Sequence, residues 1–382
     1  MKVLVVYHAG AASNARCIFH ELSRSAGLKL IVAVPEKLQV DRVYSPSGWL
    51  VAEDESANGY RVKPLPLRDP SQYHLGFERS RLRELLHSAT PDVIHVLDEA
   101  TSGYLFQTVW ERLTICRSAK VLFYGFDNLP LHLKTHSRIK WHSTWRQLAG
   151  GAGASTEAIE RVRKAGFPAD RPLQRVFWGI DAATFRPMNP AAVKRNLGLD
   201  YRHVIGFVGR LLPEKGLDVL FEAVRALDPS VHAVIIGSGP MRPSLEAAAS
   251  EPPLAGRIHF FDVMPPDKLV EYVNCMDVLT IPSLTTPAWK EQYGRVIAEA
   301  FACGIPVVGS DSGAIPEVVG NAGLIVPEGR SADLAQALRS VLFDDGMSSR
   351  LKTLALVRSQ EELSTTAMAR KLNDLYRTVM DQ

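Results

Sequence analysis

The sequence predicts an α/β protein with two Rossmann-like domains, each containing a doubly wound parallel sheet. Two observations lead to this prediction. Short apolar segments alternate with helical segments along the chain, a pattern typical of parallel sheets covered on both faces. The alternation stops at the two prolines of Phe185–Ala191 and then begins again. A chain of 382 residues has room for two such domains, because one domain takes roughly 100–200 residues.

The first domain is expected over residues 1–186. Its strands are predicted where short apolar runs are bounded by polar or glycine-containing segments. These runs are Val3–Tyr7, Leu30–Val34, Val93–Leu97, Val121–Tyr124, Ala149–Ala152 and Val176–Trp178. Helices are predicted between them, for example at Ser13–Ser25, Glu78–Ser88 and Ser102–Arg117.

The second domain is expected over residues 187–362, with a linker near residues 185–202. Its predicted strands are His203–Val208, His232–Ile236, Ile258–Phe261, Val278–Pro282, Pro306–Ser310 and Gly323–Val326. Its predicted helices are Ala191–Leu197, Leu217–Leu227, Arg295–Ala302, Ser331–Phe343 and Met347–Ser359, followed by Thr365–Met380 with Ser364 as its cap. Two such domains would face each other across a cleft at the carboxyl ends of their strands, where parallel sheets bind ligands.

The composition is that of an ordinary globular protein, with 46% apolar and 22% charged residues. This excludes a disordered, collagen-like or coiled-coil chain. The apolar runs are far shorter than the roughly 18 residues of a membrane-spanning helix, and the N-terminus lacks the features of a signal peptide. The four cysteines have no CxxC spacing and therefore indicate neither zinc nor a disulfide framework. We expect a cytoplasmic protein.

The two halves of the chain differ in charge. Residues 1–190 contain 25 lysines and arginines against 18 acidic residues, a net charge of +7. The remainder contains 19 against 23, a net charge of −4. A basic half joined to an acidic half indicates different partners for the two. Nucleic acid is not expected, because no basic patch is dense and no aromatic RNA-binding motif is present.

The most informative segment contains Glu291 and Glu299. Gly294 is expected to begin a helix that ends before Gly304, and the free N–H groups at such a helix N-terminus form a natural anion site. Glu291 precedes the helix and Glu299 lies on it, so each can contact a different part of one polyhydroxy ligand such as a ribose or a hexose. The alternative interpretation is that both carboxylates are surface groups.

A second segment, Phe207–Gly216, joins a predicted strand to a predicted helix. Arg210 and Lys215 fall in this loop, at the carboxyl end of the strand. An Arg–Lys pair there can neutralise a diphosphate, Arg through its planar fork and Lys as a point charge. The alternative interpretation is that both are solvated loop cations.

Gly237, Gly239 and Arg242 follow another predicted strand as a GxGxxR sequence. This differs from the dinucleotide-binding fingerprint, because the third glycine and the acidic residue about 20 residues further on are missing. Hydride transfer is therefore weakly supported, and a tight turn is the alternative explanation of the glycines. The polar loop Ser310–Val319 ends on the same edge, where Glu317 is a candidate first-turn helix carboxylate.

Several sequence motifs of nucleotide and metal enzymes are absent from the chain. It has no GxxxxGK[ST], HExxH, GxSxG or Asp-x-Asp sequence. No divalent-metal site or other cofactor is therefore expected. The charge of a bound diphosphate would be offset by arginine, lysine and a helix N-terminus instead.

Together these motifs resemble those of the retaining, nucleotide-sugar-dependent glycosyltransferases of the group 1 family (family four), which have the GT-B fold. The resemblance covers most of residues 150–343. It includes Gly179–Pro187, which is similar to the family's GVDxxxFxP, then FVGRLLPEKG, IIGSGP, the E-x7-E run and SGAIPEVV before GNAGLIVP. It implies that a C-terminal helix, about residues 363–382, packs back on the first domain, which would hold the acceptor.

The resemblance also implies a role for each matched residue. Arg210 and Lys215 would hold the donor diphosphate and stabilise the charge of the leaving group. Glu299 would bind the nucleotide ribose, and Glu291 the transferred sugar. Further contacts to the donor are implied for Gly209, Gly237, Gln292, Tyr293, Gly294 and Arg295, for Val263 and Met264 near the base, and for Gly10 and Ala11 of the first domain.

In the first domain the chain departs from many relatives, which carry a histidine after the strand at Val121–Tyr124. Here Asp127 and Asn128 follow that strand. Asp127 is a candidate for orienting the acceptor hydroxyl or the donor sugar, and Asn128 for contacting the substrate. The alternative is a turn-forming Asp-Asn pair. His95, at the end of another strand, is a candidate for acceptor contact, and its alternative is a core histidine.

The segment 132–146 is basic and contains Trp141 and Trp145. It is a candidate for peripheral contact with a membrane surface or a lipid-linked acceptor. The alternative, which we favour slightly, is a solvated helix with a tryptophan in the core.

We therefore expect a metal-independent, retaining glycosyltransferase in the cytoplasm or at the inner face of the membrane. It would move a hexose-type sugar from a UDP- or GDP-sugar to a saccharide, a glycoconjugate or a lipid-linked acceptor. Two alternatives remain at this point. One is an epimerase or a phosphorylase of the same fold, and the other is a catalytically silent protein that binds sugar nucleotides.

Overall fold

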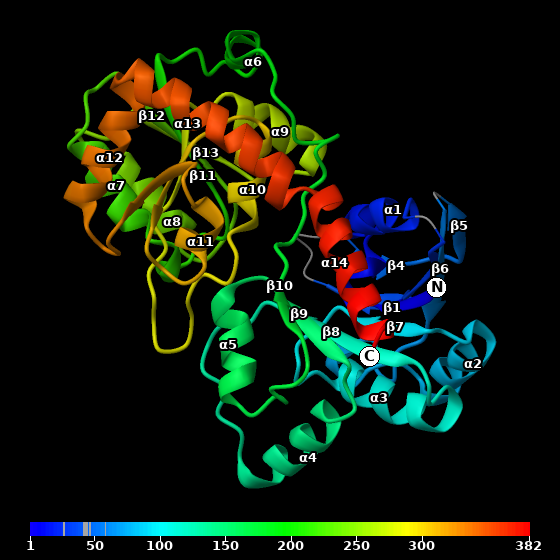
Figure 1. Cartoon of the computed structure of the whole chain (residues 1–382). Coiled ribbons are helices and arrows are strands. Elements are labelled where there is room, and N and C mark those ends of the chain that lie inside the picture. The colour runs from blue at the N-terminus through cyan, green and yellow to red at the C-terminus, as the bar shows by residue number, and fades with distance from the viewer. Residues whose placement is uncertain (26, 41–44, 46, 58) are drawn as a thin grey trace. The chain divides into compact units, whose positions relative to one another are not determined.

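The computed structural model describes residues 1–25, 27–40, 45, 47–57 and 59–382 (Figure 1). The chain forms two compact units. Unit 1 consists of Met1–Phe177 together with Thr365–Gln382, and unit 2 consists of Trp178–Ser364.

Unit 1 contains, in its described part, an eight-stranded sheet with the order β10-β9-β8-β7-β1-β2-β6-β5. Neighbouring strands are parallel except β5 and β6, which are antiparallel. The chain proceeds outward from β1 in both directions, so the predicted doubly wound sheet is confirmed. The strands are β1 (Lys2–Val6), β2 (Lys29–Pro35), β5 (Glu55–Ala57), β6 (Tyr60–Leu65), β7 (Val93–Val96), β8 (Lys120–Gly125), β9 (Gly150–Gly153) and β10 (Leu173–Arg175), with β3 (Lys37–Gln39) and β4 (Trp49–Val51) as a separate pair.

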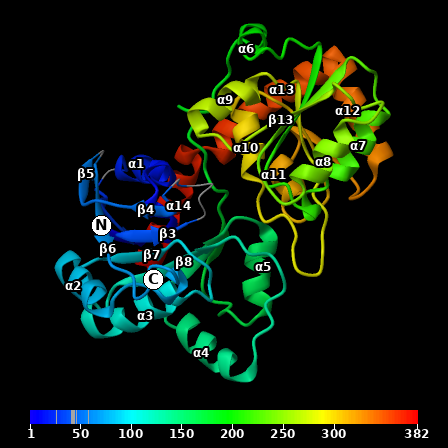
Figure 2. The ribbon, with the colours of Figure 1, turned by 180° about the vertical axis from the view of Figure 1, so that it is seen from behind.

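Helices cover both faces of this sheet, with α1 and α14 on one face and α2 and α3 on the other (Figure 1, Figure 2). Strand residues alternate between the two faces, and both faces are apolar and buried. The helical elements of unit 1 are η1 (His8–Ala11), η2 (Ser13–Arg16), α1 (Cys17–Ser23), η3 (Tyr73–Leu75), α2 (Arg79–Ala89), α3 (Gly103–Ile115), α4 (Thr135–Trp145), α5 (Thr156–Lys164) and α14 (Thr365–Met380).

The C-terminal helix α14 belongs to unit 1 because its apolar stripe packs there. Met368, Leu372, Tyr376 and Val379 recur at helical spacing and are all fully buried. The helix contacts α1, and the Thr366 hydroxyl lies 3.1 Å from a carboxylate oxygen of the α1 residue Glu21. The last helix of the sequence thus completes the core of the first unit.

Unit 2 contains a six-stranded, wholly parallel sheet with the order β13-β12-β11-β14-β15-β16. The strands are β11 (His203–Val208), β12 (Val231–Ile236), β13 (Ile258–Phe261), β14 (Val278–Ile281), β15 (Val307–Ser310) and β16 (Gly323–Val326). The helical elements are α6 (Pro190–Asn196), η4 (Pro213–Lys215), α7 (Leu217–Arg225), α8 (Arg242–Ala249), α9 (Pro266–Asn274), α10 (Arg295–Ala302), α11 (Ile315–Val319), α12 (Ser331–Phe343), α13 (Asp345–Arg358) and η5 (Ser359–Leu363). The second predicted parallel sheet is confirmed.

The boundary between the units differs from the expected residue 186. The chain from Trp178 onward is tied to unit 2, since the Tyr293 hydroxyl donates to the Trp178 carbonyl at 2.6 Å. The Ile180 N–H likewise donates to the Leu363 carbonyl at 2.9 Å. The first unit therefore ends at Phe177.

Two strand predictions for unit 1 were incomplete or wrong. Val176–Trp178 is buried but is not a strand, because the ladder with β9 is formed by Leu173–Arg175 instead. The strand β6 was missed, although it pairs with β2 along its whole length. Its sequence, Tyr60–Leu65, contains two cations and a proline and therefore lacks the apolar run that identifies a buried strand.

We predict that Gly216→Ala destabilises the protein strongly. Gly216 has φ +68°, and a Cβ there would lie 1.9 Å from the Pro282 carbonyl oxygen. Left-handed strain and this clash should together lower the free energy of unfolding by about 2–4 kcal/mol. Gly198 is a matched control, because it has φ +67° but nothing within 4 Å of its Cβ position. Gly198→Ala should cost only about 1 kcal/mol. Equal losses in urea unfolding would contradict the prediction.

Candidate functional site

A charged cluster lies at the carboxyl end of the sheet of unit 2. The Lys215 ammonium lies 2.7 Å from the Glu291 carboxylate, and the Ser283 hydroxyl donates to the same oxygen at 3.0 Å. Lys215 also lies 4.5 Å from the centre of the Trp289 ring. Glu291 is only 8% exposed. Loops that are far apart in the sequence thus bring a cation and a carboxylate into direct contact, which weakens the interpretation of both as solvated loop charges.

The loop that carries Arg210 and Lys215 has a rigid backbone. Its Leu211 N–H donates to the Ser238 carbonyl at 2.8 Å. A Cβ on Gly237 would lie 1.9 Å from the Gly209 carbonyl oxygen, so only glycine allows the two loops to meet. The exposed Arg210 side chain extends from this fixed loop, and among the residues that the structure describes it has no recorded partner.

The amide groups of Gly209 and Gly237 both form hydrogen bonds within unit 2. The Gly209 N–H donates to the Ile236 carbonyl and the Gly237 N–H to the Phe261 carbonyl, both at 3.0 Å. Neither amide is left for a ligand. The tight turn, which was the alternative explanation of Gly237 and Gly239, fits this geometry. Other contacts of Gly209 and Gly237 with a substrate stay predictions.

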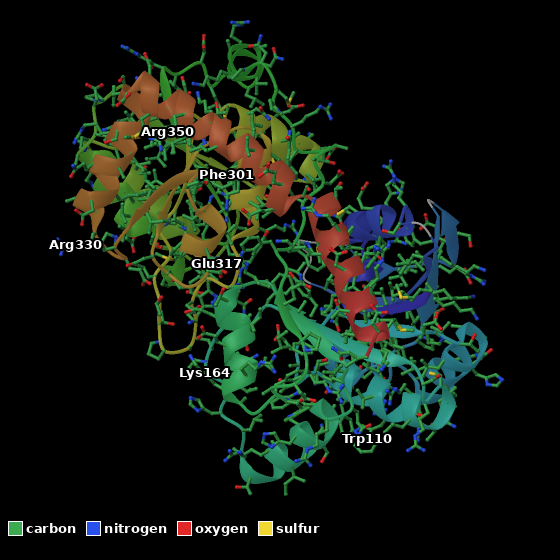
Figure 3. The ribbon with its side chains drawn as sticks, in the orientation of Figure 1. Trp110, Lys164, Phe301, Glu317, Arg330 and Arg350 are labelled. Carbon is green, nitrogen blue, oxygen red and sulfur yellow. The ribbon has the colours of Figure 1, made fainter. Side chains whose placement is uncertain are left out.

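The helix α10 begins as predicted at Gly294, whose φ is +73°. Glu299, on this helix, is 5% exposed and accepts a hydrogen bond from the Arg295 Nε at 3.1 Å. Burial raises the pKa of Glu299. The Arg295 side chain is 67% exposed, so an exposed cation covers a buried carboxyl group at the start of the helix. Glu317 lies in the first turn of α11, as its interpretation as a helix carboxylate required (Figure 3).

The remaining residues expected to contact the donor differ in their accessibility. Gln292 is exposed, but Tyr293 is buried with its hydroxyl bonded to Trp178. Only the main chain of Tyr293 can therefore reach a ligand, and that main-chain contact stays a prediction. Val263 is 46% exposed and Met264 is half-buried, just beyond the carboxyl end of β13.

Unit 1 has its own polar cluster at the carboxyl ends of β7 and β8. The Glu99 carboxylate accepts the N–H groups of Phe126 and Asp127 at 2.7 and 2.9 Å. Arg161, from α5, lies 2.7 Å from the Asp127 carboxylate and 3.4 Å from that of Glu99. Burial raises the pKa of Glu99. The arginine therefore holds two carboxylates in fixed positions at this edge.

Asp127 and Asn128 form the turn that was their alternative interpretation. The Asp127 carboxylate accepts the Leu129 N–H at 3.2 Å, a side-chain turn typical of Asp. Asn128 is 3% exposed and donates to Glu157 at 3.0 Å. The structure thus places the Asn128 side chain inside the unit, which corrects its expected contact with the substrate, whereas Asp127 remains partly accessible.

For two further features of unit 1 the structure confirms the alternative interpretations. His95 is fully buried, and its Nδ1 lies 2.8 Å from the hydroxyl of Tyr376 on α14. Burial lowers the pKa of His95 to about 3, so it is a neutral core histidine and not an acceptor contact. Trp141 and Trp145 are also buried, and the Trp145 indole donates to the Ala100 carbonyl at 2.8 Å. These tryptophans belong to the core.

Gly10 and Ala11 lie in the short helix η1, directly after β1, and are buried. A Cβ on Gly10 would lie 2.9 Å from both Tyr7 and Val34. The glycine therefore allows the chain to turn tightly over the end of the strand. A contact between these residues and a phosphate would have to use the main chain, and that role stays a prediction.

Sequence reasoning missed several residues of the two clusters. Asp98 and Glu99 directly follow a buried strand, which was a usable signal. His8 follows β1 in the same way. Ser283, Trp289 and Arg161 had no such signal, because their roles depend on which loops and helices the fold brings together.

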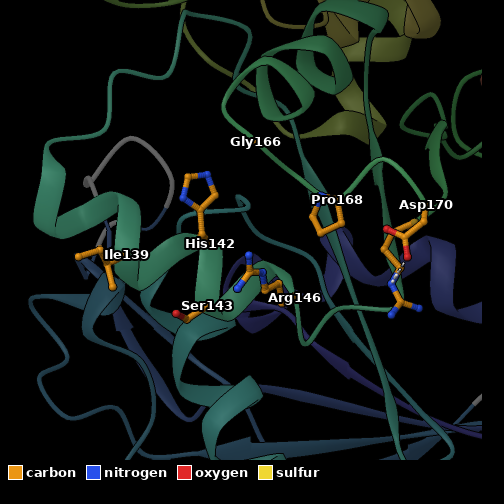
Figure 4. A pocket seen from close by; sticks show the side chains of 8 residues that line it. Ile139, His142, Ser143, Arg146, Gly166, Pro168 and Asp170 are labelled. Carbon is orange, nitrogen blue, oxygen red and sulfur yellow. Dashed lines mark ion pairs between the residues drawn. The ribbon is translucent and has the colours of Figure 1, made fainter.

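A separate cavity of about 730 Å³ lies between α4 and the chain after α5 (Figure 4). Its lining includes Ile139, His142, Arg146 and Arg171. The segment that forms its far wall leads into the amino end of β10, whereas the polar cluster of Glu99 lies at the carboxyl ends of strands. This cavity is therefore distinct from the candidate site.

In the described part of the chain, no helix is both long enough and apolar enough to cross a membrane. Within the same residues, no group of three or more His, Cys, Asp or Glu side chains is arranged to hold a metal ion.

The two α/β units with parallel sheets define a class of protein, the GT-B fold. HepE from Anabaena, solved in complex with UDP, has a TM-score of 0.76 and 17% identity, covering 99% of this chain and 100% of that chain. Sucrose-phosphate synthase from Thermosynechococcus elongatus has a TM-score of 0.71 and 18% identity, covering 100% and 99%. At these identities the likeness establishes the fold.

Sequence comparison relates part of the chain to known proteins. Residues 202–344 match the family model of glycosyl transferases group 1. A D-inositol 3-phosphate glycosyltransferase from Rhodococcus jostii is 35% identical over 241 residues, 59% of this chain and 51% of that protein. One from Mycolicibacterium gilvum is 40% identical over 147 residues, 37% of this chain and 32% of that protein. The chain spans about half the length, or less, of these relatives.

Proposed function

We propose that this protein is a retaining glycosyltransferase that moves a hexose-type sugar from a UDP- or GDP-sugar to a saccharide or glycoconjugate acceptor, without a metal. The observation that carries the proposal is the contact between Lys215 and Glu291 at the carboxyl end of a parallel sheet, on a loop that also bears Arg210, within the residues that match the group 1 family model. Parallel sheets bind ligands at this edge, and the cluster combines cations for a diphosphate with a carboxylate for sugar hydroxyls.

The geometry favours a separate role for each charged residue of the site in unit 2. Arg210 and Lys215 bind the donor diphosphate, and with the N-terminus of α10 they stabilise the negative charge that grows on it as the bond to the sugar breaks. Glu291, held by Lys215 and Ser283, accepts hydrogen bonds from hydroxyl groups of the transferred sugar. Glu299 binds the ribose.

The acceptor oxygen attacks the anomeric carbon on the face that the diphosphate leaves. The bond between the anomeric carbon and the phosphate oxygen breaks, and the new bond to the acceptor oxygen forms on the same side. The acceptor proton passes to the departing phosphate oxygen. Asp127, which lies at the carboxyl edge of unit 1, orients the acceptor hydroxyl.

The experiment that tests the proposal starts with a thermal-shift screen of sugar nucleotides and nucleoside diphosphates. One base should stabilise the protein selectively, because a ligand that binds only the folded state raises its melting temperature. The stabilising donor is then incubated with saccharide acceptors, and the anomeric configuration of the product is read by NMR. Transfer with retention is expected, whereas an inverted product would overturn the retaining mechanism.

The same incubations separate the rival functions. An epimerised sugar nucleotide formed without an acceptor would indicate an epimerase. A sugar phosphate formed with inorganic phosphate would indicate a phosphorylase. Tight donor binding with no turnover on any acceptor would indicate a silent binding protein. The relatives' name places D-inositol 3-phosphate among the acceptors to be tried.

We predict that EDTA leaves the transfer rate unchanged within about twofold. The cationic side chains and the helix N-terminus supply the charge that a divalent ion supplies in other enzymes. The measurement compares initial rates with and without the chelator, and with magnesium added back. Strong inhibition by EDTA that magnesium reverses would contradict metal independence.

A further inference from the structure

The carboxyl edge of unit 1 contains a second group of polar and aromatic side chains around His8, directly after β1. The His8 ring stacks on Tyr73, with 5.0 Å between ring centres and 25° between planes, and on Tyr104, with 6.0 Å and 22°. Its Nδ1 lies 3.7 Å from a carboxylate oxygen of Asp98, which follows β7. An imidazole, a carboxylate and two phenols are thus collected from three parts of the chain.

Two polar atoms of this group are buried without a hydrogen-bond partner among the described residues. They are the hydroxyl of Tyr104, a residue that is 1% exposed, and the Nδ1 of His8. Buried polar groups are nearly always hydrogen-bonded, because desolvation without a partner is unfavourable. Burial, and after it the charge of the Asp98 carboxylate, raises the pKa of the Tyr104 hydroxyl. A ligand that binds here can therefore supply the hydrogen-bond partners that these two atoms lack.

The aromatic neighbour Tyr73 remains partly accessible. It is 43% exposed, so the ring that stacks on His8 also presents apolar surface to solvent. An apolar ring face beside a few directed polar groups is the usual composition of a site for a small polar ligand. A sugar or polyol, which has C–H faces and hydroxyl edges, fits both features.

The charged side chains at this edge favour some sugars and polyols over others. The ends of β7 and β8 bear three carboxylates, those of Asp98, Glu99 and Asp127. Among the described residues, Arg161 is the cation in contact with these carboxylates. It forms ion pairs with Glu99 and Asp127, so its positive charge is already balanced. Burial lowers the pKa of His8 against the opposing charge of Asp98, which favours the neutral form of His8. A phosphate group would meet net negative charge here.

We propose that His8, Asp98 and Tyr104 are specificity-determining residues of the acceptor site, and that the acceptor they hold is an uncharged sugar or polyol and not a phosphorylated one. The inference rests on the glycosyltransferase function proposed above. The acceptor proposed here differs in charge from D-inositol 3-phosphate, the compound in the name of the relatives. The Tyr104 hydroxyl and the His8 Nδ1 bond to acceptor hydroxyls, and the carboxylates exclude the phosphate.

The test uses the full chain, its best donor and two acceptor pairs, glucose with glucose 6-phosphate and myo-inositol with inositol monophosphate. The uncharged member of each pair should have a kcat/KM at least about tenfold higher, since one like-charge contact changes binding by this order. Asp98→Asn should raise kcat/KM for the phosphorylated member. The ratio of kcat/KM between the uncharged and the phosphorylated member should therefore fall. Equal or better use of the phosphorylated members, or no use of any uncharged member, would overturn the proposal.

Tyr104→Phe tests the buried hydroxyl. The acceptor KM should rise about tenfold, the value of one lost hydrogen bond, while the donor KM and the melting temperature stay unchanged. Tyr376→Phe is the matched control, because its hydroxyl is already bonded to His95 in the core. That variant should lower the melting temperature and leave the acceptor KM unchanged. An unchanged acceptor KM for Tyr104→Phe would overturn the role of Tyr104.

Donor binding distinguishes a failure of this inference from a failure of the proposed function. Sugar-nucleotide binding by thermal shift does not require the acceptor group around His8. If no donor binds, the proposed function itself is wrong. If instead a donor binds and is consumed, while the acceptor preference and the acceptor KM of Tyr104→Phe differ from the expected values, only the acceptor inference is wrong.

Discussion

Replacing Lys215 by alanine should reduce the transfer rate by about a hundred- to a thousandfold. The ammonium group lies in a largely buried site, where it balances the Glu291 carboxylate at 2.7 Å and would meet the donor diphosphate. In the proposed reaction its interaction with the departing diphosphate would strengthen as negative charge grows, so its loss would raise the barrier more than it weakens donor binding. The measurement is kcat and the donor KM of the variant, and the larger change should be in kcat.

The same substitution should also lower stability. Without Lys215 the Glu291 carboxylate remains buried with Ser283 as a recorded hydrogen-bond donor. Removing one partner of a buried ion pair costs about 3–5 kcal/mol. The double variant Lys215→Met with Glu291→Gln should recover most of this loss in urea unfolding but none of the activity. Recovery of activity together with stability would show that the pair is only structural.

Arg210→Ala should reduce transfer by about a hundredfold with no change in the melting temperature. Its side chain is exposed, and the described residues contain no recorded partner for it, so truncation removes no internal contact. The backbone of its loop is held by hydrogen bonds to the neighbouring strand and loop and should keep its conformation. The substitution therefore removes only the contact that the guanidinium would make with a bound ligand. This makes Arg210→Ala a cleaner test of diphosphate binding than Lys215→Ala.

A surface arginine elsewhere in unit 2 provides the control for Arg210. Arg350 lies on α13 and is also exposed (Figure 3). Arg350→Ala should leave both the transfer rate and the donor KM unchanged. If the two alanine variants behaved alike, or if Arg210→Lys were as active as the parent protein, bidentate binding of the diphosphate by Arg210 would be refuted.

The secondary structure of unit 2 was readable from local patterns. The strands His203–Val208, Ile258–Phe261 and Gly323–Val326 and the helix Arg295–Ala302 have the predicted bounds. Buried parallel strands need unbroken apolar runs, and glycine ends or begins helices at defined conformations, so both signals lie within a few residues. Unit 1 was harder, because the strand Tyr60–Leu65 carries cations and a proline and lacks this local signal.

The sequence by itself determined the two α/β units and the loops that bear Arg210, Lys215 and Glu291, since these depend on local order along the chain. Only the tertiary structure decided which of those residues meet. Lys215 and Glu291 are 76 positions apart, and His95 and Tyr376 are 281 apart. Whether two such side chains touch depends on strand order and helix packing, which bury His95 under the last helix and leave His8 at the open edge of the sheet.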